Sequence, residues 1–319
     1  MGATPTIAHR AVMVEEVCAL LRHDRPARYV DCTLGGGGHT RALLQNSPAP
    51  ILVISLDRDP ACIAAAQQWG AAWGTRFQAI HSDFRHLTTV LAELSQPLVD
   101  SILFDLGVSS YQLDTATRGF SFRLDGPLDM RMDPTQTYTA EDFVNQASAE
   151  QLQQALYALG EARWARRITR AIVAERQRTR ITRTRHLAEL VAQSIPRAAW
   201  PTHIHPATRV FQALRMTVND ELAALTTALP QAVAALRAGG RLGVIAFHSG
   251  EDQVVKTFMR QAARGCGCPP HFPQCICGQQ PQLRLLTRKP RTPGPDELQE
   301  NPRSRSARFR VAEKLGSEE

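Results

Sequence analysis

The sequence predicts an α/β domain with a parallel sheet, interrupted by an all-helical segment. Its composition is typical of a folded globular chain, with 319 residues of which 43% are hydrophobic and 21% charged. Short strand-like runs alternate with helical ones between residues 29 and 110. This alternation stops after residue 112 and returns near Gly239, which indicates a helical block inserted within one α/β domain.

The strands expected in the first part end beside residues that can bind a ligand. We expect these strands at residues 29–31, 51–56, 77–80 and 99–104. Asp57 and Asp105 follow the second and fourth strands, and Phe84 follows the third. Because the carboxyl ends of parallel strands meet at one edge of a sheet, these side chains are expected in one crevice, where Asp57 can accept hydrogen bonds from ribose hydroxyls. The alternatives are a helix cap for Asp57 and a core position for Phe84.

Four consecutive glycines, residues 35–38, separate the first expected strand from a helix near residues 39–45. A glycine-rich turn at this place lets a ligand approach backbone N–H groups and the positive end of the helix. A phosphate-binding P-loop requires a lysine after its last glycine, whereas His39 follows Gly38. A dinucleotide-binding turn also fits poorly, because Thr40 falls where glycine or alanine is needed. An adenosyl cofactor and a ligand-free flexible turn stay open.

The inserted segment combines helix starts with many arginines. Thr139 and Ser148 each begin a capping box, which predicts two helix N-termini. The arginines that follow are Arg163, Arg167, Arg170, Arg176, Arg178, Arg180, Arg183 and Arg185. The first three share one side of a helix. This surface either binds a polyanion or is a solvated face paired in part with Glu161 and Glu175.

The second α/β part begins with a strand near residues 239–247, followed by His248 and a helix from about residue 251 to 263. Beyond the helix, two C-x-C pairs provide enough thiolates for a tetrahedral zinc site, although a reduced loop without metal is the alternative. The cysteines are Cys266, Cys268, Cys275 and Cys277. A basic run closes this part, with Arg303, Arg305, Arg308 and Arg310.

Charge and hydropathy limit the partners of the chain. A formal net charge of +7 favours a polyanion such as nucleic acid, with a mildly basic enzyme as the alternative. No apolar run is long enough to span a bilayer and the N-terminus lacks a signal-peptide pattern, so we expect no membrane partner and a cytoplasmic location. Seven cysteines, an odd number, disfavour a disulfide framework.

Seven motifs, in order along the chain, resemble those of the RsmH (MraW) family. They are DCTLGGGGH (31–39), DRDP (57–60), FDLGVSS (104–110), RGFSFRLDGPLDMRMD (118–133), HPATRVFQALR (205–215), FHS (247–249) and NPRSRS (301–306). The family comprises enzymes that use S-adenosyl-L-methionine to methylate N4 of one cytidine in the decoding region of bacterial 16S ribosomal RNA. The resemblance therefore implies an RNA methyltransferase.

The resemblance also implies a fold and a set of sites. The fold is a class I (Rossmann-like) methyltransferase sheet at residues 1–112 and 215–319, with a helical insertion on the RNA side at residues 113–214. The family's cofactor contacts fall on Gly37, Gly38, His39, Asp57, Phe84, Asp105 and Gln112. The implied partner is 16S rRNA or the small ribosomal subunit, and the family also suggests a homodimer. Two departures, Gly250 for the usual leucine and Gln253 for a frequent arginine, put local packing or an RNA contact in doubt.

Methylation of an amino group requires a proton acceptor, because the nitrogen sheds a proton as it gains the methyl group. Asp105 and His248 are the candidates, with a structural hydrogen bond as the alternative for His248. The candidate RNA contacts are Arg163, Arg167, Arg170, Arg303 and Arg305. Two other functions stay open: methylation of DNA, protein or a small molecule, and a non-catalytic RNA-binding role in ribosome assembly.

Overall fold

The computed structural model describes residues 11–47, 49–158, 163–202, 204–264, 268 and 279–316. Its contacts divide the chain into two compact units. The sheet unit comprises the described residues up to Gly107 and from Leu222 onward, and the helical unit comprises Val108–Glu221. The helical unit is longer at both ends than the expected segment 113–214, in part because its last helix, α10 (Ala207–Val218), continues past residue 214.

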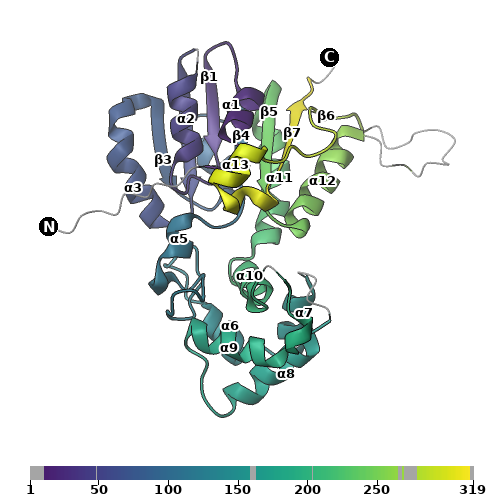
Figure 1. Cartoon of the computed structure of the whole chain (residues 1–319). Coiled ribbons are helices and arrows are strands. Elements are labelled where there is room, and N and C mark those ends of the chain that lie inside the picture. The colour runs from purple at the N-terminus through teal and green to yellow at the C-terminus, as the bar shows by residue number, and fades with distance from the viewer. Residues whose placement is uncertain are drawn as a thin grey trace. The chain divides into compact units, whose positions relative to one another are not determined.

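The described residues of the sheet unit form a seven-stranded sheet of order β3-β2-β1-β4-β5-β7-β6 (Figure 1). Its strands are β1 (Ala27–Asp31), β2 (Ile51–Asp57), β3 (Phe77–His81), β4 (Val99–Asp105), β5 (Leu236–Ala246), β6 (Leu283–Leu285) and β7 (Arg308–Lys314). Strands β1 to β5 are parallel, whereas β7 is antiparallel to both of its neighbours. The predicted strands of both α/β parts are confirmed.

Helices cover both faces of the sheet, because side chains alternate between the faces along each strand. In β4, Ile102 and Phe104 pack with α4, α11 and α12, whereas Leu103 packs on the opposite face with α1, α2 and α3. The helices are α1 (Val14–Leu21), α2 (Gly38–Asn46), α3 (Pro60–Gly70), α4 (Leu87–Glu93), α11 (Glu221–Ala235), α12 (Ser249–Arg264) and α13 (Pro295–Glu300). The sheet unit is thus a three-layer α/β structure.

Strand β7 corrects the interpretation of the C-terminal basic run. Arg308 and Arg310 lie in this inner strand, and both bind Asp252 of α12. Arg310 is buried, with its Nε 2.7 Å from Asp252 Oδ1. Arg308 is exposed although it is paired with Asp252, and Arg303 and Arg305 are exposed in the short 3₁₀ turn Pro302–Ser306 that precedes the strand.

The helical unit has its own apolar core. Its helices are α5 (Ser110–Asp114), α6 (Ala140–Gln146), α7 (Ala149–Ala158), α8 (Ala165–Arg176), α9 (Thr184–Ser194) and α10. The capping boxes at Thr139 and Ser148 are confirmed by reciprocal hydrogen bonds at the starts of α6 and α7. Helix α8 buries Ile168 and Ile172, which leaves its arginines on the outer face. Within the described part of the chain, no helix combines the length and apolarity needed to cross a bilayer.

Candidate functional site

The carboxylate of Asp57, at the end of β2, holds the glycine loop that follows β1. Gly35 N donates to Asp57 Oδ2 at 2.7 Å, and Asp59 N donates to Oδ1 at 2.8 Å. Burial raises the pKa of Asp57 from its ordinary value to about 6. A carboxylate can accept about four hydrogen bonds. Asp57 therefore has acceptor positions left for the hydroxyl groups of a ligand.

Gly37 and Gly38 are crowded by the protein itself. Gly37 has a φ of +78°, which favours glycine, and a Cβ at this position would overlap the indole of Trp69. A Cβ at Gly38 would overlap the side chain of Ala11. These contacts explain the two glycines by local packing, so a substitution at Gly37 would disturb the loop whether or not a ligand approaches it.

A buried polar cluster, absent from the sequence prediction, lies beneath the loop. Thr40 Oγ1 donates to Asp31 Oδ2 at 2.7 Å and lies 2.8 Å from Ser55 Oγ. Burial raises the pKa of Asp31. Thr33 Oγ1 accepts a hydrogen bond from Asp105 N at 2.6 Å. The signal in the sequence was Asp31 itself, a charged residue that ends an apolar strand.

The buried His39, at the start of α2, faces the partly buried Asp105 at the end of β4. His39 Nε2 lies 2.8 Å from the carbonyl oxygen of Val12, which can only accept, so we assign the ring proton to Nε2. The other nitrogen, Nδ1, lies 3.5 Å from Asp105 Oδ2.

Asp105 also presents an oxygen to a ligand. Burial raises its pKa to about 6, and the nearby His39 opposes this shift. Asp105 Oδ1 is buried and has no hydrogen-bond partner among the described residues. Because a buried unpaired acceptor is unfavourable, this oxygen is suited to a donor that the protein does not supply.

Phe84 lies in a 3₁₀ turn, Phe84–His86, that follows β3. Its ring meets the buried ring of Phe104 edge to face, with the centroids 5.5 Å apart. Asp83 anchors the turn, because Oδ1 accepts from Arg85 N at 2.8 Å and Oδ2 lies 3.1 Å from Arg58 Nη2. The ring of Phe84 is partly exposed, so it combines a core contact with a free surface.

His248 caps helix α12. Its Nδ1 accepts hydrogen bonds from Gly250 N at 3.1 Å and Glu251 N at 3.3 Å. Glu251 Oε2 in turn accepts from the backbone N–H groups of Phe247 and His248. His248 Nε2 lies 3.1 Å from Glu251 Oε1, without the alignment of a hydrogen bond. A Cβ at residue 250 would lie 3.1 Å from the imidazole, so glycine relieves crowding at this cap.

Gln112 belongs to the helical unit, in contrast to the other expected cofactor contacts. It forms the capping box of α5 with Ser109: Gln112 Oε1 accepts from Ser109 N at 3.1 Å, and Gln112 N donates to Ser109 Oγ at 3.3 Å. The side chain is buried. Within its own unit, Gln112 therefore has a structural role.

The arginines of the helical unit fall into two groups. Arg176 donates to the carbonyl oxygens of Val144 and Ala147, at the end of α6. Arg180 pairs with Glu141 and Asp142, and Arg183 pairs with Asp125. In the second group, Arg167 and Arg170 are exposed, and no ion pair joins them to the described carboxylates. Arg163 lies over the ring of Trp164. The second group is the better candidate for binding a polyanion.

The zinc hypothesis concerns residues that lie largely outside the described part of the chain. Cys266, Cys275 and Cys277 are outside it, and Cys268 is the one of the four that the structure describes. Among the residues that are described, no group of three or more His, Cys, Asp or Glu side chains has an arrangement that could hold a metal ion.

Comparison with known proteins identifies the family. The model of the MraW methylase family matches residues 6–315. The protein named ribosomal RNA small subunit methyltransferase H from Trichlorobacter lovleyi is 49% identical over 308 residues, which cover 97% of this chain and 98% of that protein. Its namesake from Geobacter sulfurreducens is 49% identical over 310 residues, 97% of this chain and 100% of that protein. The chain belongs to the MraW methylase family.

Proposed function

We propose that this protein transfers a methyl group from S-adenosylmethionine to N4 of a cytidine in the decoding region of bacterial 16S ribosomal RNA. The proposal rests on the group of side chains at the ends of the parallel strands, in a chain that belongs to the MraW methylase family. Asp57 and Asp105 end β2 and β4, and the glycine loop follows β1, which lies between these two strands. Relatives with nearly half of their residues identical are named for methylation of small-subunit ribosomal RNA.

The residues at the strand ends fit an adenosyl cofactor. The acceptor positions of Asp57 suit ribose hydroxyls, and the partly exposed ring of Phe84 suits an adenine face. The buried Oδ1 of Asp105 suits a donor such as the ammonium group of the methionine part. When bound, S-adenosylmethionine supplies an electrophilic methyl group on its sulfonium.

The chain must then orient the amino group of cytosine and take up one proton. The N4 lone pair forms a bond to carbon as the carbon–sulfur bond breaks, and N4 loses a proton. Asp105 is our candidate for the proton acceptor, because burial raises its pKa to about 6. The hydrogen bonds of His248 support a positioning role through the cap of α12.

RNA binding is assigned to exposed arginines in both units. These are Arg163, Arg167 and Arg170 of the helical unit, and Arg303 and Arg305 of the sheet unit. Residues 163–215 contain twelve arginines and two acidic residues, and the charge left after the pairing of Arg180, Arg183 and Arg215 with carboxylates elsewhere in the unit still favours a polyanion. We propose that the reaction takes place in the cytoplasm, where bacterial ribosomes assemble, and that the protein forms a homodimer.

The test is transfer of a labelled methyl group to three substrates: naked 16S rRNA, 30S particles and assembly intermediates. We expect transfer to at least one of them, and nuclease mapping with mass spectrometry should locate the label on N4 of a single cytidine. Asp57→Ala, which lacks the ribose acceptor, serves as the inactive control.

Two outcomes would contradict the proposal. Label on DNA, protein or a small molecule in the absence of RNA would mean a different methyl acceptor. A folded wild-type protein that binds RNA but gives no calorimetric signal with S-adenosylmethionine would mean a non-catalytic assembly factor.

A further inference from the structure

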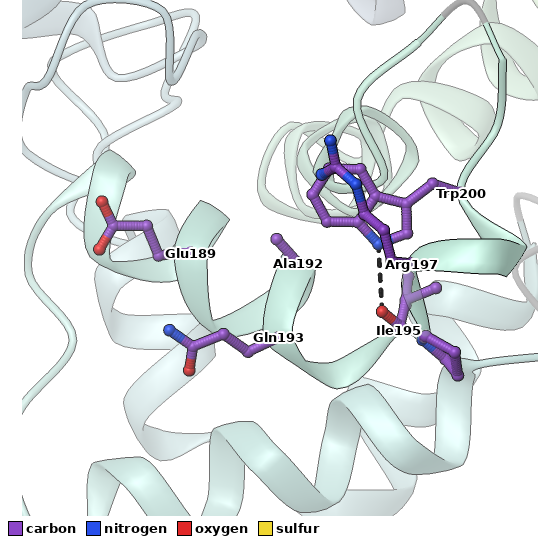
Figure 2. Close-up of a pocket in the computed structure, with 7 residues that line it drawn as sticks. Glu189, Ala192, Gln193, Ile195, Arg197 and Trp200 are labelled. Atoms are coloured by element: carbon purple, nitrogen blue, oxygen red, sulfur yellow. Dashed lines mark hydrogen bonds between the residues drawn. The ribbon is translucent and has the colours of Figure 1, made fainter.

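The helical unit contains an open groove that no step of the proposed reaction uses. Its volume is about 430 Å³, and it lies beside the C-terminal half of α9 and the turn that follows (Figure 2). The groove is lined by Glu189, Ala192, Gln193, Ile195, Pro196, Arg197 and Trp200. We propose that the stacked pair of Arg197 and Trp200 in this groove binds an unpaired base of the RNA substrate. This inference rests on the proposed function, since it takes single-stranded RNA as the ligand.

The geometry of the pair is that of a stacking platform. The Arg197 guanidinium carbon lies 3.8 Å from the centroid of the Trp200 ring, and Figure 2 shows the guanidinium over the indole. Arg197 is exposed, whereas Trp200 packs in part against the core of the helical unit. A base can therefore stack on the outer face of the guanidinium, with the indole as the layer beneath it.

The platform is fixed before a ligand arrives. Trp200 Nε1 donates to the carbonyl oxygen of Ile195 at 3.1 Å, and the indole meets the ring of His205 edge to face. His205 in turn contacts the ring of Phe122, with centroids 4.8 Å apart. Burial, and next the charge of Arg197, lower the pKa of His205. The indole is thus held in one orientation beneath the guanidinium of Arg197, so little entropy is lost in this lower layer when a base stacks on the guanidinium.

The surrounding charge favours RNA over an acidic or apolar protein segment. Residues 163–215 carry twelve arginines and two acidic residues, and three of these arginines, Arg180, Arg183 and Arg215, are paired with carboxylates outside this range. One of the two, Glu189, lies at the end of the groove away from Trp200 in Figure 2. The other, Glu175, lies next to His186. A basic surface with a planar stacking group is the combination that binds single-stranded nucleic acid with little sequence preference.

The experiment measures binding of an oligocytidylate of about 12 nucleotides to the full-length protein and its variants, over a series of salt concentrations. We expect Trp200→Ala to weaken binding roughly tenfold or more, and Trp200→Phe, which keeps a ring, to restore most of the loss. Arg197→Ala should weaken binding and lower the salt slope by about 0.7. Arg197→Lys should restore the slope without the affinity, because lysine keeps the charge but has no planar group.

Two controls separate stacking from loss of stability or net charge. The melting temperature of each variant should stay near that of the wild type, and Arg288→Ala, an exposed arginine of the sheet unit, should bind like the wild type. If Trp200→Ala and Trp200→Phe both fold and bind RNA with the same affinity, while the wild type methylates RNA, the groove inference fails and the proposed function stands. If the wild type neither binds nor methylates RNA, the proposed function fails and the groove inference with it.

Discussion

The two units use charged side chains in opposite ways. In the sheet unit, the carboxylates of Asp31, Asp57 and Asp105 are held at strand ends, where burial raises their pKa values. In the helical unit, Arg167 and Arg170 lie on an outer helix face in water. A buried charged group interacts strongly with a few donors in fixed positions. Exposed charges each contribute little binding energy, and they act together through the electrostatic potential that they produce. The first arrangement suits one small cofactor and the second suits a long polyanion.

The largest expected effect comes from removing one strand-end carboxylate. Asp57→Ala should weaken binding of S-adenosylmethionine by about 100-fold or more, because hydrogen bonds to a charged group contribute about 1.5–3 kcal/mol each. Isothermal titration calorimetry measures the change. Asp24→Ala, which removes an exposed carboxylate of the same unit, should bind the cofactor normally. Equal affinities of the two variants would mean that the strand-end site does not hold the cofactor.

The next effect is a dependence of cofactor binding on pH. The pKa values of Asp57 and Asp105 are raised to about 6, and hydrogen-bond donors of the cofactor favour the ionised carboxylates. Binding therefore releases protons below pH 6, and the affinity should fall as pH drops through 6, by about tenfold for each of the two carboxylates between pH 7 and pH 5. Calorimetry across this range gives the profile. Asp105→Asn should make the pH profile of the affinity less steep. If the profile of this variant is as steep as that of the wild type, Asp105 does not contribute to the pH dependence.

A smaller effect is expected for the exposed arginines. The double variant Arg167→Ala/Arg170→Ala should lower RNA affinity roughly tenfold at low salt and reduce the salt slope by about 1.4, the value for two phosphate contacts on a single strand. Filter binding at several salt concentrations measures both quantities. The charge-matched control is Arg288→Ala/Lys289→Ala, in an exposed part of the sheet unit. If the two double variants lose affinity equally, the helix α8 surface has no special part in binding.

The smallest effect concerns the cap of α12. His248→Ala should destabilise the protein by about 1 kcal/mol, the usual contribution of a helix N-cap. His248→Asn offers an acceptor oxygen in place of Nδ1 and should restore most of the stability, because asparagine is a favourable N-cap residue. Its kcat should stay within about threefold of the wild-type value, since the cap of α12 is kept. Chemical denaturation and steady-state kinetics test the pair. A stable asparagine variant with a hundredfold lower kcat would show that the imidazole itself takes part in the reaction.

Much of the sheet unit could be predicted from local patterns. Apolar runs followed by Asp57 and Asp105 predicted the strands and their functional ends. A short apolar run and the polar residue that ends it can both be recognised from consecutive residues. The C-terminal strand β7 escaped prediction. Arg308 and Arg310 look like a solvated basic tail in the sequence, and their partner Asp252 lies more than fifty residues earlier in α12. Pairing over such a separation leaves no local signal.

The same limit applies to the sites. The sequence by itself determined the glycine loop, the strand-end carboxylates, the arginine-rich helix and the family likeness, since each is a matter of residue type at short spacing. Tertiary structure alone decided that Trp69 and Ala11 fill the space beside Gly37 and Gly38, that His39 faces Asp105, and that Arg197 covers Trp200. These are contacts between side chains, and the direction of a side chain depends on packing that the whole chain establishes together.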